Sequence, residues 1–284
     1  MKILKRVLPP DGVATKYLQE TDDGFVVEAT YIRRVEKHTL CVSTQVGCVI
    51  GCRFCASGLR SEGSLYHRSL TSPEMVEECC NITGEIDLAA HPKPLTFAFM
   101  GEGEPFLNFD ECVKAFHTLA AMNWSVPMQL AVSTSGIRPD LIRNLSEITF
   151  PVRLKLQVSL HGPSDDIRSQ IVPTTKPVSE IVAATRAYRE KCGRPVIWNY
   201  VMCAGVNDRP EHAQQLVELL GSGWHVKFTR LNITAGSPFY PASRELVKQF
   251  RRILENGGLS TAYSETDESG IQSGCGQLSY HYVR

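Results

Sequence analysis

Short apolar stretches alternate with stretches of helical periodicity along most of this 284-residue chain. The apolar stretches are rich in β-branched and aromatic residues, which predicts strands at residues 25–32, 39–43, 95–100, 129–133, 154–160, 196–201 and 226–231. The intervening stretches predict helices at residues 72–83, 109–122, 139–145, 178–191, 209–220 and 243–256. This alternation indicates an α/β fold with a parallel sheet. Because crossover connections are right-handed, strands in chain order favour a βα barrel over a flat doubly wound sheet.

The composition is that of an ordinary globular protein. Hydrophobic residues make up 43% and charged residues 21%, which excludes a largely disordered chain. Thirty Lys and Arg balance thirty Asp and Glu, so the zero net charge argues against a strongly basic nucleic-acid-binding surface and leaves only local basic patches. No apolar run reaches the ~18 residues of a membrane span, and the N-terminus lacks the apolar core of a secretory signal. We therefore expect a cytoplasmic protein that does not associate with membranes.

Cysteine spacing points to an inorganic centre. A long chain without an export signal is not a disulfide scaffold, so metal binding, catalysis and burial are the alternatives for its cysteines. Cys48, Cys52 and Cys55 form a C-x3-C-x2-C cluster after a predicted strand. Three thiolates leave one iron of a 4Fe–4S cluster open to chelate a substrate, whereas structural zinc sites use four protein ligands. The alternative is a zinc site with Cys41 as fourth ligand, in a non-catalytic metal-binding module.

Six segments, in their order and spacing, carry a resemblance to the RlmN/Cfr branch of the radical S-adenosylmethionine (SAM) superfamily. They are residues 39–48, 100–105, 132–136, 158–161, 200–208 and 274–278. The resemblance runs from about Lys16 to the C-terminus. It implies a radical SAM partial (β/α)6 barrel with N- and C-terminal extensions. We expect a lead-in and strand extension at residues 1–38, the core barrel at 39–235, and a C-terminal extension with the methyl-accepting cysteine at 236–284.

The resemblance implies a radical methyl transfer that uses one 4Fe–4S cluster, held by Cys48, Cys52 and Cys55, and two SAM molecules per turnover. Cys275 would first be methylated. A radical formed on that methyl group would add to an electron-poor aromatic carbon. Glu28 would remove a proton from this carbon, and Cys41 would release the product by forming a disulfide with Cys275. Without the resemblance, Glu28 is most simply a solvated charge on a strand face and Cys275 a buried small hydrophobe.

The resemblance also implies a set of SAM contacts, namely Gly103, Glu104, Ser133, Ser159, Leu160, His161 and Asn232. Taken alone, the serine at residue 133 belongs to a Ser-Thr-Ser stretch that is typical of a strand-end turn. His161 alone is more often a core histidine with satisfied hydrogen bonds. The five cysteines without a counterpart in the family are interpreted as packing residues, namely Cys79, Cys80, Cys112, Cys192 and Cys203.

The substrate implied by the resemblance is adenine in RNA, methylated at carbon 2 or carbon 8. The alternative is the same chemistry on a small molecule, nucleotide or peptide. Residues 264–270 are acidic where the family is basic, Leu231-Asn-Ile-Thr234 replaces a Trp-Asn-Pro segment, and we expect no N-terminal accessory domain. RNA affinity would then depend on local basic residues, namely Arg33, Arg34, Lys37, Arg60 and Arg68. The expected partners are an electron donor such as flavodoxin or ferredoxin and no second protomer.

Overall fold

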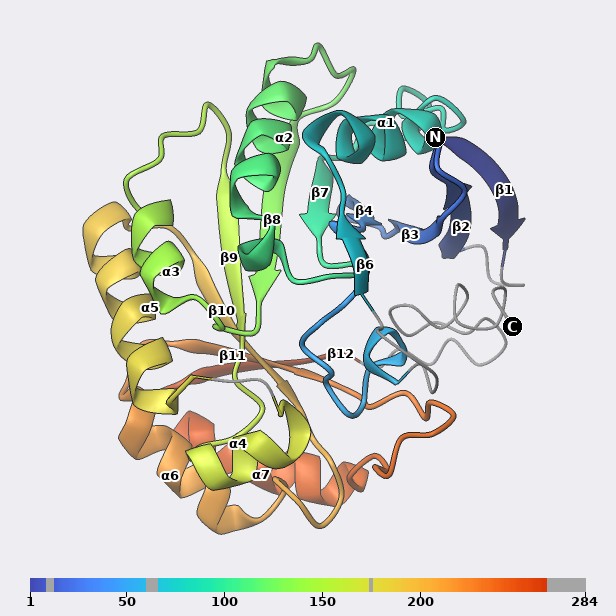
Figure 1. The fold of residues 1–284 in the computed structure, drawn as a ribbon. Helices are drawn as coiled ribbons and strands as arrows, with labels where there is room; N and C mark the ends of the chain where they lie inside the picture. The colour runs from blue at the N-terminus through green and yellow to red at the C-terminus, as the bar shows by residue number, and fades with distance from the viewer. Residues whose placement is uncertain (9–12, 60–65, 174–175, 265–284) are drawn as a thin grey trace.

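One curved ten-stranded sheet organises the protein (Figure 1). The computed structural model describes residues 1–8, 13–59, 66–173 and 176–264. Strands follow the order β1-β2-β3-β4-β7-β8-β9-β10-β11-β12 across the sheet. The parallel part consists of β4 (His38–Val42), β7 (Leu95–Phe99), β8 (Met128–Thr134), β9 (Leu154–Ser159), β10 (Val196–Val201), β11 (His225–Thr229) and β12 (Ser260–Ser264). Its spatial order equals its chain order, as the alternation of strands and helices predicts.

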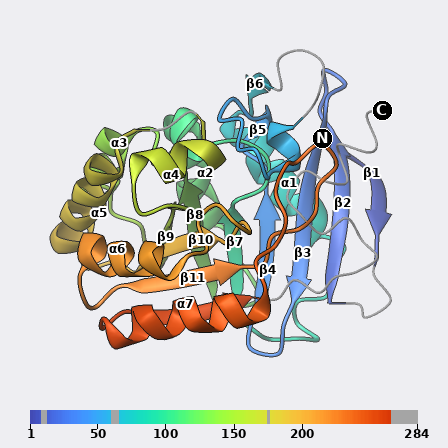
Figure 2. The ribbon, with the colours of Figure 1, turned by 90° about the horizontal axis from the view of Figure 1, so that it is seen from below.

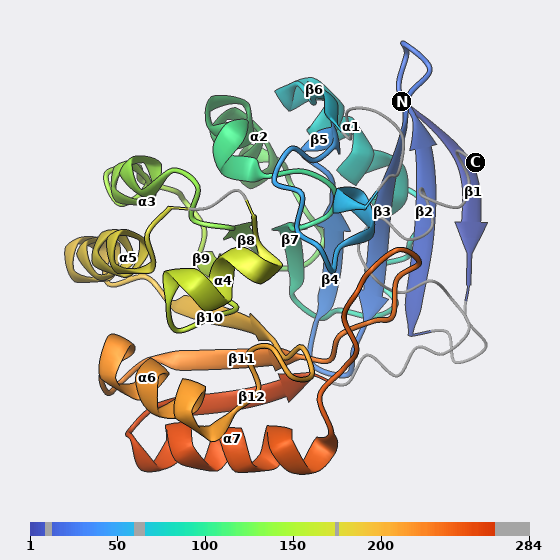
Figure 3. The same ribbon diagram turned by 60° about the horizontal axis from the view of Figure 1, so that its bottom comes forward.

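Helices cover the outer side of the curved sheet, as Figure 3 shows for α2, α3, α5, α6 and α7. The helices are α1 (Ser72–Thr83), α2 (Phe109–Ala121), α3 (Pro139–Leu145), α4 (Asp165–Ile171), α5 (Val178–Cys192), α6 (Pro210–Leu220) and α7 (Arg244–Asn256). The start of α1 is fixed by a capping box in which the Thr71 side chain accepts from the Glu74 N–H. Aromatic contacts join helix to sheet: the Phe99 and Phe116 rings meet edge to face at 4.5 Å.

Three antiparallel strands extend the parallel sheet beyond β4 on one side of the molecule (Figure 2). They are β1 (Lys2–Val7), β2 (Ala14–Glu20) and β3 (Val26–Arg33). Alternate side chains of these strands, such as Tyr17, Val27 and Tyr31, are buried in the main hydrophobic core. Because side chains of a strand alternate between faces, the even-numbered residues of β2 and β3 point to the inner side of the curved sheet.

A second, two-stranded sheet lies between β4 and α1 in the chain. It pairs β5 (Gln45–Gly47) with β6 (Tyr66–Ser69), and the short 3-10 turns η1 (Ala56–Gly58) and η2 (Pro105–Leu107) flank the same region. The Asn108 side chain ties the region together, because its amide donates to the backbone oxygens of Thr44 (2.9 Å) and Leu70 (2.7 Å). These elements hold the loop that carries the clustered cysteines.

Each strand and helix predicted from the sequence is present, with ends that agree to within two residues. The predictions omitted six strands and α-helices, namely β1, β2, β5, β6, α4 and β12, and the two 3-10 turns. The seventh parallel strand, β12, pairs with β11 from Ser260 to Ser264. No helix in the described ranges is long and apolar enough to cross a membrane. The division of the chain after residues 38 and 235 stays a prediction.

Candidate active site

Cys48, Cys52 and Cys55 lie on the tight loop that follows β5, beyond the carboxyl end of β4. The Cys55 N–H donates to the Cys52 oxygen at 3.0 Å, and the Gly58 N–H donates to the Cys55 oxygen at 2.9 Å. A Cβ atom on Gly58 would lie 2.5 Å from the Cys52 oxygen and 2.9 Å from its nitrogen. The loop can therefore close only around a glycine at this position.

Replacing Gly58 with alanine should open this loop and disrupt the spacing of the three thiols. We expect the Gly58→Ala protein, purified without oxygen, to hold less than half of the iron of the unaltered protein. Gly84→Ala is the matched control, because an added Cβ at the end of α1 would lie 3.2 Å from the Cys80 oxygen and 3.8 Å from the Asn81 oxygen, farther than the contacts at Gly58. Equal iron content in the two variants, measured by iron assay and absorbance, would contradict the proposed ligand loop.

The three thiols share an environment suited to an inorganic cluster. Burial raises the pKa of the Cys48 thiol to about 12 and also raises the pKa values of Cys52 and Cys55. For Cys48 and Cys52, repulsion between the negative charges of neighbouring thiolates raises the pKa further. Backbone N–H groups oppose it: Ile50 donates toward Cys48, and Ser57 and Gly58 donate toward Cys55. Such amide donors stabilise cluster thiolates.

Within the described part of the chain, no three His, Cys, Asp or Glu side chains are placed to hold a single metal ion. This holds for the three cysteines as well. In a 4Fe–4S cluster each thiolate binds a different iron, so the three sulfur atoms do not have to converge on one point.

The cysteine loop contacts three segments that are distant from it in the sequence. The Arg53 N–H donates to the oxygen of Ile171, the last residue of α4, at 2.9 Å. The Thr234 hydroxyl, in the segment after β11, donates to the Phe54 oxygen at 3.4 Å. The Phe54 ring meets the His161 ring edge to face at 5.1 Å. The fold thus brings the predicted cluster loop beside the predicted SAM residues at the carboxyl ends of the parallel strands.

Gly103 and Glu104 lie at the end of β7, against the start of the cysteine loop. Gly103 has a φ of 101°, and an added Cβ would lie 2.6 Å from the Gln45 Cβ, so both conformation and space require glycine. The Glu104 carboxylate is buried and accepts the N–H of Ser135 at 2.7 Å and the N–H of Phe106 at 3.0 Å. Burial raises the pKa of Glu104, while these donors oppose that rise.

His161 follows β9 and has a φ of 57°, the only positive φ of a residue other than glycine in the described ranges. Its Nδ1 accepts the Val201 N–H at 3.1 Å, and its carbonyl oxygen accepts from the Asn207 amide at 2.7 Å. Burial lowers the pKa of His161 to about 3, with the nearby Arg168 charge adding to it, so the ring is neutral. Since Nδ1 accepts, Nε2 carries the ring proton. Strained backbone of this kind concentrates at functional sites.

Arg168, on α4, was not identified from the sequence. Its buried guanidinium crosses from β9 to β8: Nε donates to the Leu160 oxygen at 2.9 Å, and Nη2 donates to the oxygens of Ser159 (3.2 Å) and Ser135. Nη1 is buried and has no hydrogen-bond partner in the described part of the chain. Burial lowers the pKa of Arg168 to about 10, and the charges of Cys52, Asp165 and Glu104 partly restore it. The site therefore contains a buried cation with an unused donor.

The remaining predicted SAM residues occupy the same strand ends. Ser133 lies near the end of β8, where its hydroxyl is 3.5 Å from the Asn199 amide. Ser159 ends β9, and the Leu160 N–H donates to the Asn199 oxygen at 3.0 Å. The Asn232 carbonyl oxygen accepts from the Thr234 hydroxyl, the group that also reaches Phe54. Their role as SAM contacts stays a prediction.

Glu28 and Cys41 lie on the inner face of the sheet, and β3, the strand of Glu28, contacts β5, which leads into the cysteine loop. Cys41 pairs with Thr30 across β3 and β4, so Glu28 is its diagonal neighbour on the same face. The Ser43 hydroxyl donates to the Glu28 carbonyl oxygen at 2.8 Å. Glu28 is buried and its carboxylate meets Lys16, so it is not a solvated surface charge. Cys275, the predicted methyl carrier, lies outside the described residues.

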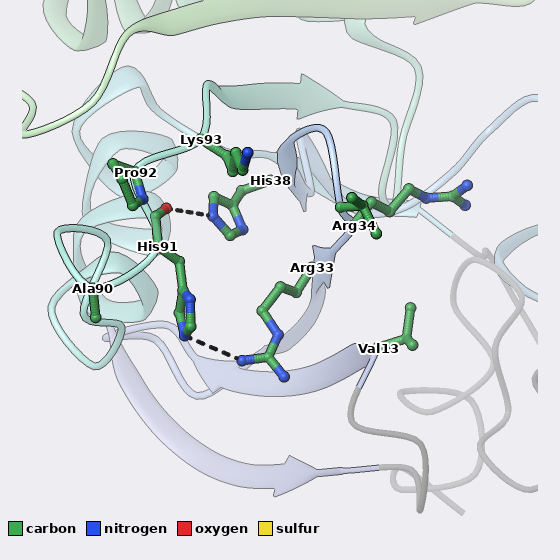
Figure 4. A pocket seen from close by; sticks show the side chains of 9 residues that line it. Val13, Arg33, Arg34, His38, Ala90, His91, Pro92 and Lys93 are labelled. Atoms are coloured by element: carbon green, nitrogen blue, oxygen red, sulfur yellow. Dashed lines mark hydrogen bonds between the residues drawn. The ribbon is translucent and has the colours of Figure 1, made fainter.

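A basic pocket lies at the opposite ends of the strands. Arg33, His38, His91 and Lys93 line part of this space of about 440 Å³, and none of its described lining residues is acidic. In Figure 4 the Arg33 side chain points to the His91 ring, 3.4 Å away, and His38 donates to the His91 carbonyl oxygen at 2.9 Å. The basic pocket lies at the amino end of β4 and the cysteine loop beyond its carboxyl end. The five residues of β4 span about 16 Å at ~3.3 Å per residue.

The local basic residues named from the sequence therefore lie in different surroundings. Arg33, Arg34 and Lys37 lie in or beside the β3–β4 hairpin at the basic pocket. Arg68 instead bonds the carboxylates of Asp23 (2.7 Å) and Glu74 (2.7 Å), so two acids neutralise its charge. Arg60 lies outside the described residues.

The residues present fit both groups that the resemblance implies. The thiols meet backbone donors, as iron–sulfur ligands do. The unused Arg168 Nη1 offers a buried donor for an anionic group such as a carboxylate. Of the five cysteines interpreted as packing residues, Cys79, Cys112 and Cys203 are fully buried.

Comparisons with known proteins agree with this arrangement. The family model of the radical SAM superfamily matches residues 42–220. The chain is 39% identical over 271 residues to a probable dual-specificity RNA methyltransferase RlmN of Symbiobacterium thermophilum, covering 93% of this chain and 70% of that protein. It is 34% identical to the dual-specificity RNA methyltransferase RlmN of Syntrophobacter fumaroxidans, over 99% of this chain and 81% of that protein.

Solved structures show the same fold. A radical SAM methyltransferase from Sphaerobacter thermophilus superposes with a TM-score of 0.87 at 33% identity, over 97% of this chain and 80% of that one. A spore photoproduct lyase mutant, at 13% identity and a TM-score of 0.58, shares the fold alone. The cofactors of this superfamily are a 4Fe–4S cluster and SAM. The chain belongs to the radical SAM superfamily and, within it, to the RlmN family of methyltransferases.

Proposed function

We propose that this enzyme methylates an amidine-type sp2 carbon of adenine in RNA, at carbon 2 or carbon 8, through a methyl group carried on Cys275. The observation that carries this proposal is the placement of Glu28 and Cys41 as diagonal neighbours on the inner face of the sheet, where β3 contacts β5, the strand that leads into the three-cysteine loop. A carboxylate and a second thiol next to such a loop are the two groups that a thioether-linked methyl transfer requires besides the carrier.

Cys48, Cys52 and Cys55 would hold the cluster, with Gly103, Glu104, Ser133, Ser159, Leu160, His161 and Asn232 around SAM. When bound, these cofactors supply the radical that activates the methyl group. Neutral His161 can donate from Nε2, and the buried Arg168 guanidinium can face an anion. The reductant, the monomeric state and the use of two SAM molecules stay predictions.

The protein residues complete the transfer. Addition of the methylene radical on the Cys275 sulfur to the ring carbon leaves one unpaired electron on the ring, and this electron would return to the cluster, which SAM cleavage leaves oxidised by one electron. Glu28 takes the proton of that carbon, and the C–H electron pair returns to the ring. The Cys41 thiolate then attacks the Cys275 sulfur. The S–S bond forms, the C–S bond breaks, and the C–S electron pair leaves with the methylene carbon, which takes up a proton and becomes the methyl group.

RNA is supported as the substrate by the names of the relatives and by a group of cations at the amino ends of the strands. Arg33, Lys37, Lys93, Arg153 and Lys155 form this basic rim. Burial is the largest cause that lowers the pKa of Lys155. The positive charges of Lys37 and Arg153 lower it further, because these three cations lie close together. Gathered cations bind phosphates. A folded RNA is long enough to reach the rim while one base lies in the active site.

The direct test is anaerobic reconstitution of the enzyme with iron, sulfide, SAM and a reductant, followed by incubation with RNA and with adenosine nucleotides. We expect methylated adenosine after digestion of the RNA, as measured by mass spectrometry. Methylation of nucleotides alone would favour the small-molecule alternative. Failure to cleave SAM with a loaded cluster would contradict the proposed enzyme activity.

Neutralising Arg33, Lys37 and Lys93 of the basic rim together as alanines should weaken RNA binding. The slope of log affinity against log salt should fall by about two to three, because about one counterion is released per phosphate contact. The matched control replaces three exposed cations elsewhere, namely Arg143, Lys248 and Arg252. SAM cleavage should not change in either variant. Equal salt slopes in the two triple variants would show that RNA does not contact the rim.

A further inference from the structure

Lys16 and Glu28 form an ion pair inside the protein. The Lys16 Nζ lies 2.7 Å from the Glu28 Oε1, and the two side chains are only 1% and 3% exposed. Both residues belong to the antiparallel strands added beside the barrel, Lys16 to β2 and Glu28 to β3. Lys16 lies opposite Thr30 in the sheet, which makes it a diagonal neighbour of Glu28.

The pair shares its face with Cys41. Thr30 pairs with Lys16 on one side and with Cys41 on the other, so the three residues form one row across β2, β3 and β4. On the adjacent strands β2 and β4, the described titratable side chains closest in register to Glu28 on this face are Lys16, Glu20 and Cys41. Of these, Lys16 forms the ion pair with the Glu28 carboxylate. The other face of these strands, with Tyr17 and Tyr31, packs in the hydrophobic core.

Stability alone does not account for this pair. Removing two charges from water costs several kcal/mol per ion, and well-packed apolar residues in place of a buried ion pair are often as stable or more stable. A carboxylate that is buried without a cation favours its protonated form, and a protonated carboxyl cannot accept another proton. A cation in contact keeps the carboxylate ionised in a site from which water is excluded.

We propose that Lys16 is a positioning residue for proton transfer: its ammonium group pairs with the Glu28 carboxylate and orients it as the base that deprotonates the methylated carbon. This inference rests on the proposed role of Glu28. In the step, the C–H bond of the substrate carbon breaks, an O–H bond forms on Glu28, and the C–H electron pair returns to the ring. Lys16 keeps its proton and contacts no substrate atom.

The test measures single-turnover formation of the adduct between Cys275 and substrate in the Cys41→Ala background, where product release is blocked. Adding Lys16→Met should slow adduct formation by roughly a hundredfold, the usual contribution of a general base. Adding Lys16→Arg should restore most of the rate, because arginine supplies the same charge. Lys5→Met, an exposed lysine of β1, is the matched control and should have no effect.

Rates are normalised to the fraction of chains with a methylated Cys275, since only folded, cluster-loaded protein carries that methyl group. Lys16→Gln serves in the same way if Lys16→Met yields too little folded protein. An unchanged normalised rate in either variant would overturn the role of Lys16 and leave the proposed function intact. Absence of any adduct in Cys41→Ala alone would instead contradict the proposed function.

Discussion

The Cys41→Ala protein should be isolated with its substrate covalently attached. Formation of the bond between the Cys275 methylene and the ring carbon needs only Cys275 and a base, whereas its cleavage needs a second thiol. The described structure places Cys41 beside Glu28 on the inner face of the sheet, where that thiol would act. We expect turnover to fall below detection. Mass spectrometry of the digested protein should show Cys275 bearing a nucleotide.

The iron content of the same variant should stay at about four per chain, because Cys41 is not a proposed cluster ligand. Cys80→Ala is the matched control: Cys80 is a partly buried thiol on α1 and should affect neither turnover nor iron content. Loss of most iron from Cys41→Ala would support the four-ligand zinc alternative. An unmodified Cys275 in protein expressed with its natural RNA would contradict the two-cysteine mechanism.

The second large effect is expected for Arg168→Met. Arg168 donates to carbonyl oxygens of Ser135, Ser159 and Leu160, which lie at the ends of two neighbouring strands. Removing it leaves two buried acceptors and one partly buried acceptor without this donor and should destabilise the protein by about 3–5 kcal/mol. We expect a lower thermal midpoint and a loss of SAM affinity of at least tenfold, measured by calorimetry with the loaded protein.

Arg168→Lys separates the two contributions of this side chain. Lysine keeps the charge but cannot form the planar set of donors that reaches both strands. It should therefore restore part of the SAM affinity and little of the stability. A thermal midpoint of Arg168→Met equal to that of the unaltered protein would show that the strand ends do not depend on this residue.

The parallel barrel could be predicted from the sequence because its strands carry regularly placed apolar residues. Strand β7 is buried at every position, whereas β9 and β11 bury every second residue, among them Leu156 and Val226 in the main core. The missed elements lack this signal. Strand β12 reads Ser-Thr-Ala-Tyr-Ser, and the seven-residue helix α4 has two aspartates and an arginine. Their formation depends on neighbours that are distant in sequence.

The candidate site was predictable only where its residues form a local motif. Cys48, Cys52 and Cys55 stand within eight residues of one another, so their spacing alone indicated a cluster. Lys16 contacts Glu28 on the neighbouring strand, and Arg168 contacts carbonyl oxygens at strand ends, so no local pattern in the sequence marks either residue. The sequence also did not distinguish Arg68, neutralised by Asp23 and Glu74, from the residues of the basic pocket, because only the fold brings those acids to it.

The short hairpin between β3 and β4 has a consequence for evolution. Arg33 pairs with His38, and the Arg34 N–H donates to the Lys37 oxygen at 3.0 Å, which closes the turn and sets the register of the two strands. A shift of β3 by one residue would turn Glu28 to the opposite face of the sheet. Insertions and deletions in this turn should therefore be rare among related enzymes, although the turn lies at the far end of the strands from the chemistry. Loop length can thus be under selection for catalysis at a surface position that never contacts the substrate base.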